Sequence, residues 1–281
     1  MPEAAAPAKG TRPQGALTEA DASRQVREMF TQIAPRYDLL NHLLSLQLDR
    51  LWRARVARRF RAILDRPDAL VLDLCCGTGD LAFSLARGSR ARIIGADFSH
   101  AMLVRARQKS ATLGNSAAGW FAKKTPASES GRYNGEASNA AALMPFFEAD
   151  ALRLPFAGGS FELVTTAFGF RNLANYEEGL KEIRRVLKPG GTLAILEFTE
   201  PPAGLVGNFY RWYFRNILPR IGGLLSGDRS AYTYLPASVS RFFRPAELAS
   251  LITAVGYGSA EFNVWTLGTV AFHTARKIAT L

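Results

Sequence analysis

The stretch that decides the fold is VLDLCCGTGDLAFSLA, residues 71–86, where an apolar run ends in an acid and a glycine turn opens an amphipathic segment. This order predicts a strand, a turn and a helix, because Gly77 and Gly79 lack a Cβ and let the backbone approach a ligand closely. The G-x-G-x-x-G pattern of dinucleotide-binding folds is absent, and Asp73 at the strand end would repel a pyrophosphate. A ligand with a free ammonium and a sulfonium would be attracted instead.

Short apolar runs recur along the chain and alternate with helical segments. Five of them are expected to be strands, at Leu70–Leu74, Arg92–Ala96, Phe146–Ala149, Phe161–Ala167 and Thr192–Phe198. Two further runs, Ser259–Trp265 and Gly268–Thr274, predict a closing antiparallel hairpin. This alternation predicts an α/β fold with a doubly wound, mainly parallel seven-stranded sheet covered on both faces.

The domain organisation follows from shifts in composition. Residues 1–20 are rich in Ala, Pro and Gly and are expected to form a disordered tail without chemistry, followed by one domain over 21–281. Residues 21–66 have helical periodicity interrupted at Pro35, which predicts a helical preface. The polar stretch 112–142 is too long for an ordinary connection and is expected to be a flexible insertion.

Further acids follow the next two expected strands. Asp97 lies twenty residues beyond Gly77, where a carboxylate can accept both hydroxyls of a ribose, and Asp150 and Ala151 follow the third strand. Helix caps or turns explain each acid singly but not the ordered set. The set resembles motif I and the following acids of class I S-adenosylmethionine-dependent methyltransferases. The resemblance implies that S-adenosyl-L-methionine is bound by Asp73, Gly77, Thr78, Gly79, Asp97, Asp150 and Ala151.

From about Val26 onward the chain resembles the ubiquinone/menaquinone biosynthesis C-methyltransferase family. The segments that carry the resemblance are FTQIAPRYDLLNHLLSLQLDRLWR (30–53), VLDLCCGTGD (71–80), FGFRNL (168–173), RRVLKPGGTLAILEF (184–198), LPRIGGLLSGD (218–228) and YTYLPASVSRF (232–242). The resemblance implies C-methylation of a polyprenylated quinol ring, with demethylmenaquinol as the favoured substrate. Two alternatives stay open: the C-methylation step on the benzoquinol precursor of ubiquinone, and a noncatalytic cofactor-binding member of a quinone-synthesis assembly.

Three positions depart from the family pattern. Gln47 and Asp49 stand where the family usually has glycine and histidine, so no role of that histidine is carried over. Ala167 replaces a serine that is typical of ubiquinone-type members and, with the YLPASV segment, favours the menaquinone pathway. The 112–142 insertion is the third departure.

The resemblance also implies catalytic roles. A phenol has a pKa of about 10, so the site must stabilise a phenolate or supply a base. Arg171 is expected to face the developing negative charge, while Asn172 binds a quinol oxygen and Tyr37 closes the cleft. Arginine stays protonated, so Asp97, through a water, is the candidate proton acceptor. An ordinary ion pair for Arg171 and a packing role for Tyr37 remain alternatives.

The charge balance predicts an anionic partner. The 35 basic and 24 acidic side chains give a net charge of +11, and the segment TTAFGFRNL lacks the catalytic motifs of nucleic-acid methyltransferases. We therefore expect no nucleic acid partner. The aromatic and arginine-rich segment 205–225, within an expected cover over 203–244, predicts peripheral docking on anionic membrane.

The cysteines and the apolar runs limit the remaining classes. Cys75 and Cys76 are adjacent and give neither a disulfide framework nor a metal-ligand spacing, so no metal is expected. No apolar run reaches the roughly 18 residues of a membrane span, and no secretory leader is recognised. The sequence predicts a cytoplasmic protein at the inner face of the membrane and leaves a homodimer open.

Overall fold

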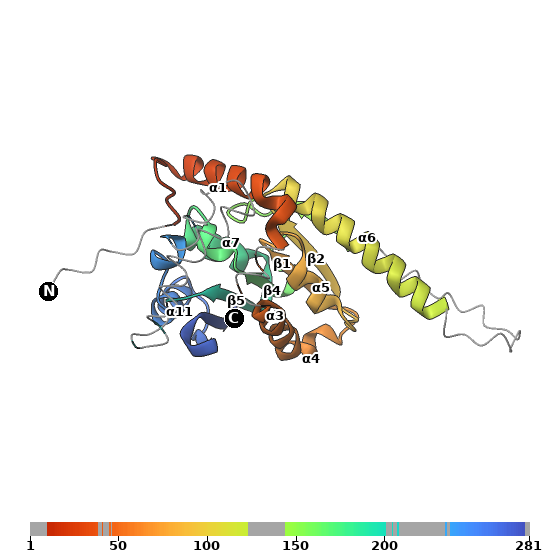
Figure 1. The fold of residues 1–281 in the computed structure, drawn as a ribbon. Coiled ribbons are helices and arrows are strands. Elements are labelled where there is room, and N and C mark those ends of the chain that lie inside the picture. Colours follow the sequence, from red (N-terminus) through yellow and green to blue (C-terminus); the bar gives the residue numbers. More distant parts are fainter. Residues whose placement is uncertain are drawn as a thin grey trace, which may run out of the picture.

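The computed structural model describes residues 10–38, 41, 45, 47–122, 144–200, 204, 207, 234 and 237–278. Within them the strands form one seven-stranded sheet in the order β3-β2-β1-β4-β5-β7-β6 (Figure 1). Strands β1 to β5 pair in parallel, and β7 pairs antiparallel with both β5 and β6, which confirms the expected fold class. The strands are β1 Leu70–Leu74, β2 Arg92–Asp97, β3 Phe146–Glu148, β4 Phe161–Ala167, β5 Leu187–Phe198, β6 Glu261–Trp265 and β7 Val270–Arg276.

Helices cover both faces of the sheet, and the alternating side chains of the strands supply two cores. Val71, Leu163 and Ala194 pack with α3, α5 and α6, whereas Leu72 and Val164 pack with α7 and α11 on the opposite face. The helical elements are α1 Glu19–Ile33, η1 Ala34–Arg36, α3 Leu48–Arg59, α4 Arg61–Leu64, α5 Asp80–Ala86, α6 His100–Ala122, η2 Phe170–Asn172, α7 Tyr176–Val186, α11 Pro245–Ala254 and η4 Thr266–Gly268.

The strand order places a cleft at the carboxyl ends of the central strands. The chain runs from β1 outward through β2 to β3, then returns across β1 to add β4 and β5. Connections therefore leave β1 and β4 on opposite sides, and open α/β sheets bind ligands at such a reversal. Helix α1 lies across this end of the molecule, beside the start of α6 (Figure 1).

The structure describes residues 10–20 of the expected disordered tail, and the last two of them are helical. Helix α1 begins at Glu19 behind an N-cap at Thr18, and Gly10 and Thr11 are buried. The Thr11 N–H donates to the Leu173 carbonyl at 2.8 Å. Composition gave no sign of this contact, because the segment is ordered by a distant part of the chain and not by its own periodicity. Residues 1–9 lie outside the described residues.

The expected insertion over 112–142 begins within a helix. Helix α6 continues to Ala122 and runs out past the sheet (Figure 1). Its Ala- and Ser-containing composition is compatible with a helix, although it shows no amphipathic pattern. Residues 123–142 lie outside the described residues, as does most of the expected cover over 203–244. None of the described helices is both long and apolar enough to cross a bilayer.

A glycine in β2 gives a test of the packing beneath the cleft. A Cβ on Gly95 would lie 2.4 Å from Cδ1 of Phe146, whose ring packs against Phe83 with centroids 5.9 Å apart. We expect Gly95→Ala to lower the free energy of unfolding by about 1–3 kcal/mol through overpacking. Urea denaturation measures the change.

The matched control is Gly258→Ala. A Cβ there would lie 3.5 Å from the Arg276 carbonyl oxygen, which is ordinary van der Waals contact. Equal losses for the two alanine variants would contradict the packing argument.

Candidate active site

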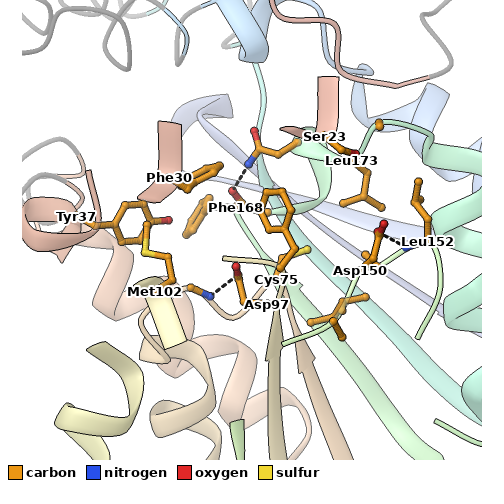
Figure 2. A pocket seen from close by; sticks show the side chains of 18 residues that line it. Ser23, Phe30, Tyr37, Cys75, Asp97, Met102, Asp150, Leu152, Phe168 and Leu173 are labelled. Carbon is orange, nitrogen blue, oxygen red and sulfur yellow. Dashed lines mark hydrogen bonds between the residues drawn. The ribbon is translucent and has the colours of Figure 1, made fainter. Parts of the chain in front are cut away.

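A pocket with about 650 Å3 of empty volume opens at the carboxyl ends of β1, β2 and β4 (Figure 2). The structure brings five of the sequence-predicted positions to its wall together with Tyr37 from the helical preface. Four others, Asp73, Thr78, Gly79 and Arg171, are not among the lining residues. The pocket is lined by Ser23, Phe30, Tyr37, Leu74, Cys75, Gly77, Asp97, Phe98, Met102, Ala149, Asp150, Ala151, Leu152, Phe168, Gly169, Asn172, Leu173 and Ala174.

The glycine turn forms the floor of this pocket. Gly77 and Gly79 have φ values of 55° and 89°, in the left-handed region that side chains rarely adopt. A Cβ on Gly77 would lie 3.6 Å from the ring of Tyr37, so the turn is covered closely from above. Cys75 has a φ of 55° without being glycine, and such strain is common at ligand sites.

Asp97 connects the glycine turn to the end of β2. Its carboxylate accepts hydrogen bonds from the N–H groups of Gly77 and Ser99, each at 2.9 Å, and it is 6% exposed. Burial raises the pKa of Asp97 to about 6, although the backbone hydrogen bonds oppose this shift. The carboxylate lies at the pocket wall, where it can accept hydrogen bonds from hydroxyl groups of a ligand.

Asp73 lies beneath the pocket and not on its wall. One carboxylate oxygen accepts from the Thr165 hydroxyl at 3.0 Å, whereas Oδ2 is buried without a hydrogen-bond partner in the described part of the chain. Burial raises the pKa of Asp73 to about 7, which the Thr165 hydrogen bond partly offsets. A second acid below the turn therefore favours a cationic ligand, because a nearby positive charge would stabilise its ionised form.

Thr78 holds the turn to the helical preface. Its hydroxyl donates to Asp38 at 2.5 Å and accepts from Lys109 at 3.0 Å. Lys109 also forms ion pairs with Asp38 at 2.6 Å and Asp80 at 2.7 Å. The side chain therefore fastens the segment that carries Tyr37 over the turn, instead of lining the pocket.

Tyr37 directly follows η1, and its ring covers the glycine turn. Its ring packs edge-on against Phe30 with centroids 6.0 Å apart, so α1 supports it. Burial raises the pKa of the Tyr37 hydroxyl, and Coulomb attraction to Arg171 partly opposes the shift. Tyr37 is therefore held between α1 and the glycine turn.

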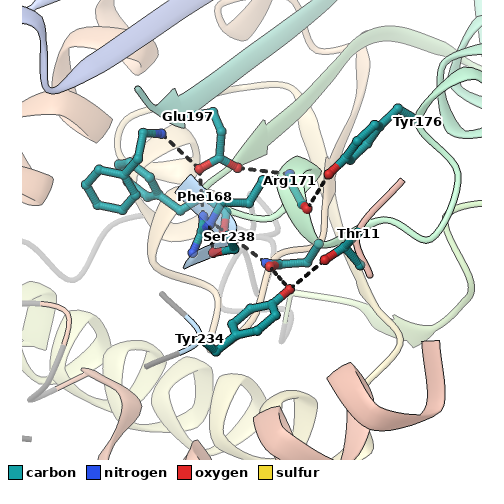
Figure 3. Close-up of polar contacts among 9 residues, drawn as sticks. Thr11, Phe168, Arg171, Tyr176, Glu197, Tyr234 and Ser238 are labelled. Atoms are coloured by element: carbon teal, nitrogen blue, oxygen red, sulfur yellow. Dashed lines mark hydrogen bonds and ion pairs between the residues drawn. The ribbon is translucent and has the colours of Figure 1, made fainter. Parts of the chain in front are cut away.

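Arg171 lies behind the pocket in a buried ion pair (Figure 3). Its Nη1 donates to Glu197 at 2.6 Å and to the Phe168 carbonyl at 2.5 Å, and its Nε donates to Ser238 at 3.4 Å. The guanidinium carbon is 5.5 Å from the centre of the Phe198 ring. These contacts fix the backbone of Phe168, which lines the pocket with a left-handed φ of 60°.

Asn172 is the neighbour of Arg171 that does reach the pocket. Its Nδ2 donates to the Phe168 carbonyl at 3.4 Å, and its Oδ1 accepts from Tyr234 at 2.9 Å. The amide is 9% exposed, so a ligand in the pocket would meet a desolvated hydrogen-bonding group.

The expected pair follows the third strand. The pocket is also lined by residues after β2 that the sequence did not predict as site residues. Asp150 and Ala151 line the pocket, and Asp150 Oδ1 accepts from the Leu152 N–H at 2.9 Å. Phe98 and Met102 line it as well. Phe98 directly follows Asp97 and Met102 lies in the first turn of α6, and apolar residues at both positions also fit an ordinary core, so the sequence offered little signal for them.

The pocket fits S-adenosyl-L-methionine. Its wall combines apolar side chains with a few polar groups, as the walls of small-molecule sites commonly do. The unpaired Oδ2 of Asp73 and the carboxylate of Asp97 give a negative environment suited to a sulfonium and an ammonium. Across the described residues there is no group of three or more metal-ligating side chains.

Solved structures place the fold among methyltransferase folds. A methyltransferase from Thermotoga maritima matches with a TM-score of 0.57 and 16% identity, over 90% of this chain and 99% of that one. The [4+2]-cyclase SpnF matches with a TM-score of 0.55 and 18% identity, over 92% and 97%. At these identities the likeness shows the fold alone, which is one that class I methyltransferases have.

The sequence comparisons identify the family within this class. The family model of the ubiE/COQ5 methyltransferase family matches residues 17–129 and 128–277, so the chain belongs to this family. A demethylmenaquinone methyltransferase from Thermus thermophilus is 44% identical over 250 residues, covering 89% of this chain and all of that protein. A ubiquinone/menaquinone biosynthesis C-methyltransferase from Geotalea daltonii is 37% identical over 263 residues, covering 93% and 99%.

The raised pKa of Asp97 predicts how cofactor binding depends on pH. The ionised carboxylate accepts hydrogen bonds from ribose hydroxyls better than the protonated acid, so the contribution of Asp97 to affinity should be constant above about pH 7. Below a pKa of about 6 it should fall towards tenfold per pH unit. Isothermal titration calorimetry with S-adenosyl-L-methionine from pH 5 to 8 measures this dependence.

Asp97→Asn is the control, because it keeps the shape of the side chain without a titrating group. We expect weaker binding at pH 8 and a smaller fall in affinity down to pH 5, because Asp73, whose pKa is about 7, still titrates. An unchanged pH dependence in this variant would assign the titration to another group.

Proposed function

We propose that this enzyme methylates a ring carbon of a polyprenylated quinol and that demethylmenaquinol is its substrate. The observation that carries the proposal is the 44% identity, over the full length of the relative, to a protein named demethylmenaquinone methyltransferase. A second such protein, from Deinococcus radiodurans, is 45% identical over 249 residues. The pocket supports the proposal, because Asn172 reaches the cavity that Asp97 and Gly77 also line.

In the proposed mechanism the protein stabilises negative charge on the quinol. S-adenosyl-L-methionine supplies an electrophilic methyl group, and loss of the hydroxyl proton makes the ring carbon a better nucleophile. Asn172 donates an N–H to a quinol oxygen, and this bond strengthens as that oxygen gains charge. Arg171 contributes through its electrostatic field and by fixing Phe168, while its charge is partly balanced by Glu197.

Two further roles complete the proposal. Tyr37 closes the pocket over the reacting groups, since it already covers Gly77. Asp97, through a water, is the candidate proton acceptor, and its pKa of about 6 lies closer to neutrality than that of an ordinary aspartate. The expected contact of Asp97 with ribose hydroxyls would compete with this role. Release of the quinol hydroxyl proton to water is therefore the simpler alternative.

A second substrate is favoured by a specific observation. The Geotalea daltonii relative, 37% identical, has a name that includes ubiquinone biosynthesis. The benzoquinol precursor of ubiquinone is therefore the alternative to demethylmenaquinol. Ala167, at the end of β4, stands where ubiquinone-type members tend to have serine and favours the first substrate.

Product analysis tests the proposal directly. The enzyme is incubated with S-adenosyl-L-methionine and a short-chain demethylmenaquinol or demethoxyubiquinol under reducing conditions. We expect a mass increase of one methyl group on the naphthoquinol at a higher kcat/KM than on the benzoquinol. No methylated product from either quinol, with the cofactor bound, would support a noncatalytic cofactor-binding role.

Arg171 variants separate its charge from its packing. Arg171→Lys keeps a cation opposite Glu197, whereas Arg171→Gln removes it. We expect the glutamine variant to lose at least tenfold more kcat than the lysine variant, because a fixed cation stabilises developing negative charge. Equal kcat values in two variants with equal cofactor affinity would remove the charge from the mechanism.

We also propose that the enzyme contacts an anionic membrane from the cytoplasmic side, where a polyprenylated substrate lies. The segment 205–225 falls almost wholly outside the described residues. Helix α3, which is described, also has exposed basic side chains. Arg50 and Arg55 are exposed there. Trp52 of the same helix donates to Thr266 at 2.8 Å, which places α3 beside η4 at the carboxyl edge of the sheet. A homodimer remains an open alternative.

Vesicle sedimentation tests the membrane contact. We expect binding to phosphatidylglycerol vesicles that weakens with salt, and no binding to phosphatidylcholine vesicles. Arg50→Glu with Arg55→Glu should weaken binding more than Arg90→Glu with Arg92→Glu, since β2 begins at Arg92 at the opposite edge of the sheet. Equal sedimentation with both kinds of vesicle would contradict the proposal.

A further inference from the structure

A hydrogen-bonded chain connects the N-terminal segment to the amide of Asn172 (Figure 3). The Thr11 hydroxyl lies 3.0 Å from the Tyr234 hydroxyl, and Tyr234 donates to Asn172 Oδ1 at 2.9 Å. Thr11 and Tyr234 are 223 residues apart, and Tyr234 and Asn172 are 62 apart. Three distant segments therefore meet at one side chain of the pocket.

The direction of this chain follows from the count of protons. A tyrosine hydroxyl has one proton, and Tyr234 uses it on the acceptor oxygen of Asn172. Thr11 must then be the donor to Tyr234. The chain accordingly runs from Thr11 through Tyr234 to Asn172, and each member has one direction compatible with the next.

The Phe168 carbonyl fixes which end of the Asn172 amide faces Tyr234, because a carbonyl oxygen only accepts hydrogen bonds and therefore lies beside the amide nitrogen. Oδ1 is held by Tyr234, and Nδ2 lies towards the Phe168 carbonyl at 3.4 Å. An amide nitrogen carries two protons, so one N–H remains to donate to a ligand. A flipped amide would instead present an oxygen to the developing quinolate and repel it.

Thr11 and Tyr234 also lie in a separate cavity, with about 1270 Å3 of empty volume, between the N-terminal segment, α1 and residues 237–241. Asn172 lines the first pocket and not this one. The Tyr234 hydroxyl therefore reaches Asn172 from outside the first pocket.

We propose that Tyr234, held by Thr11, is a positioning residue that keeps the Asn172 N–H directed at the quinol oxygen. The inference rests on the proposed quinol methylation and adds to it a specific function for the N-terminal segment. The hydrogen bond from the Asn172 N–H to the quinol oxygen strengthens as charge develops on that oxygen. Loss of this hydrogen bond should therefore lower kcat more than it raises KM.

Tyr234→Phe tests this with Tyr257→Phe as the matched control. Tyr257 is buried, whereas Tyr234 is half-buried, and the Tyr257 hydroxyl donates to the Leu180 carbonyl at 3.0 Å, away from both cavities. We expect Tyr234→Phe to lower kcat/KM for the quinol by about two- to tenfold, the equivalent of one net hydrogen bond. Tyr257→Phe should reduce only thermal stability, and the Kd for S-adenosyl-L-methionine should stay unchanged in both.

Thr11 provides a graded second test. Thr11→Val removes the donor but leaves Tyr234 able to reach Asn172, so a smaller loss is expected, and Thr11→Ser should restore wild-type kinetics. Equal kcat/KM values for Tyr234→Phe and Tyr257→Phe would overturn the inference while leaving the proposed function intact.

A second readout keeps the inference testable should the wild type methylate no quinol. The Asn172 side-chain amide gives a pair of signals in a 1H–15N spectrum, assigned by their absence in Asn172→Asp. We expect these signals to shift or broaden in Tyr234→Phe and to stay in place in Tyr257→Phe. Signals that are unchanged in Tyr234→Phe would overturn the orientation argument independently of activity.

Discussion

The hydrogen bond from the Gly77 N–H to Asp97 is the interaction on which the site depends. It joins the turn after β1 to the end of β2 at 2.9 Å, so the cofactor loop is held open between two parallel strands. The same carboxylate accepts from Ser99, which begins the approach to α6. Because Asp97 is buried, its ionised form depends on these donors, and a ligand hydroxyl would stabilise it further.

Around this floor the protein uses buried charge for shape more than for direct contact. Arg171 and Glu197 form an ion pair behind the wall and hold the strained Phe168 backbone in place. Removing one member of such a pair leaves the other charged and buried, which costs more than the pair contributes. The sequence predicted that Arg171 faces the substrate. In our proposal Arg171 instead acts through its electrostatic field and through its hydrogen bond to the Phe168 carbonyl in the pocket wall.

Similar folds do not settle the reaction. The cyclase SpnF shares the architecture at 18% identity, so the fold alone does not specify methyl transfer to a quinol. What distinguishes chains of this fold is the set of groups that reaches the pocket beside the cofactor. In this enzyme Asn172 is the polar member of that set next to Phe168 and Gly169.

The sequence by itself determined the strands, the glycine turn and the acids Asp97 and Asp150, because these features depend on periodicity and on residues close together in the chain. The carboxyl ends of parallel strands meet at one edge, so their acids converge in any such fold. Only the tertiary structure decided that Arg171 pairs with Glu197, and that Thr11, assigned to a disordered tail, reaches Tyr234. Contacts across 26 and 223 residues follow no local pattern, since they arise when whole elements pack together.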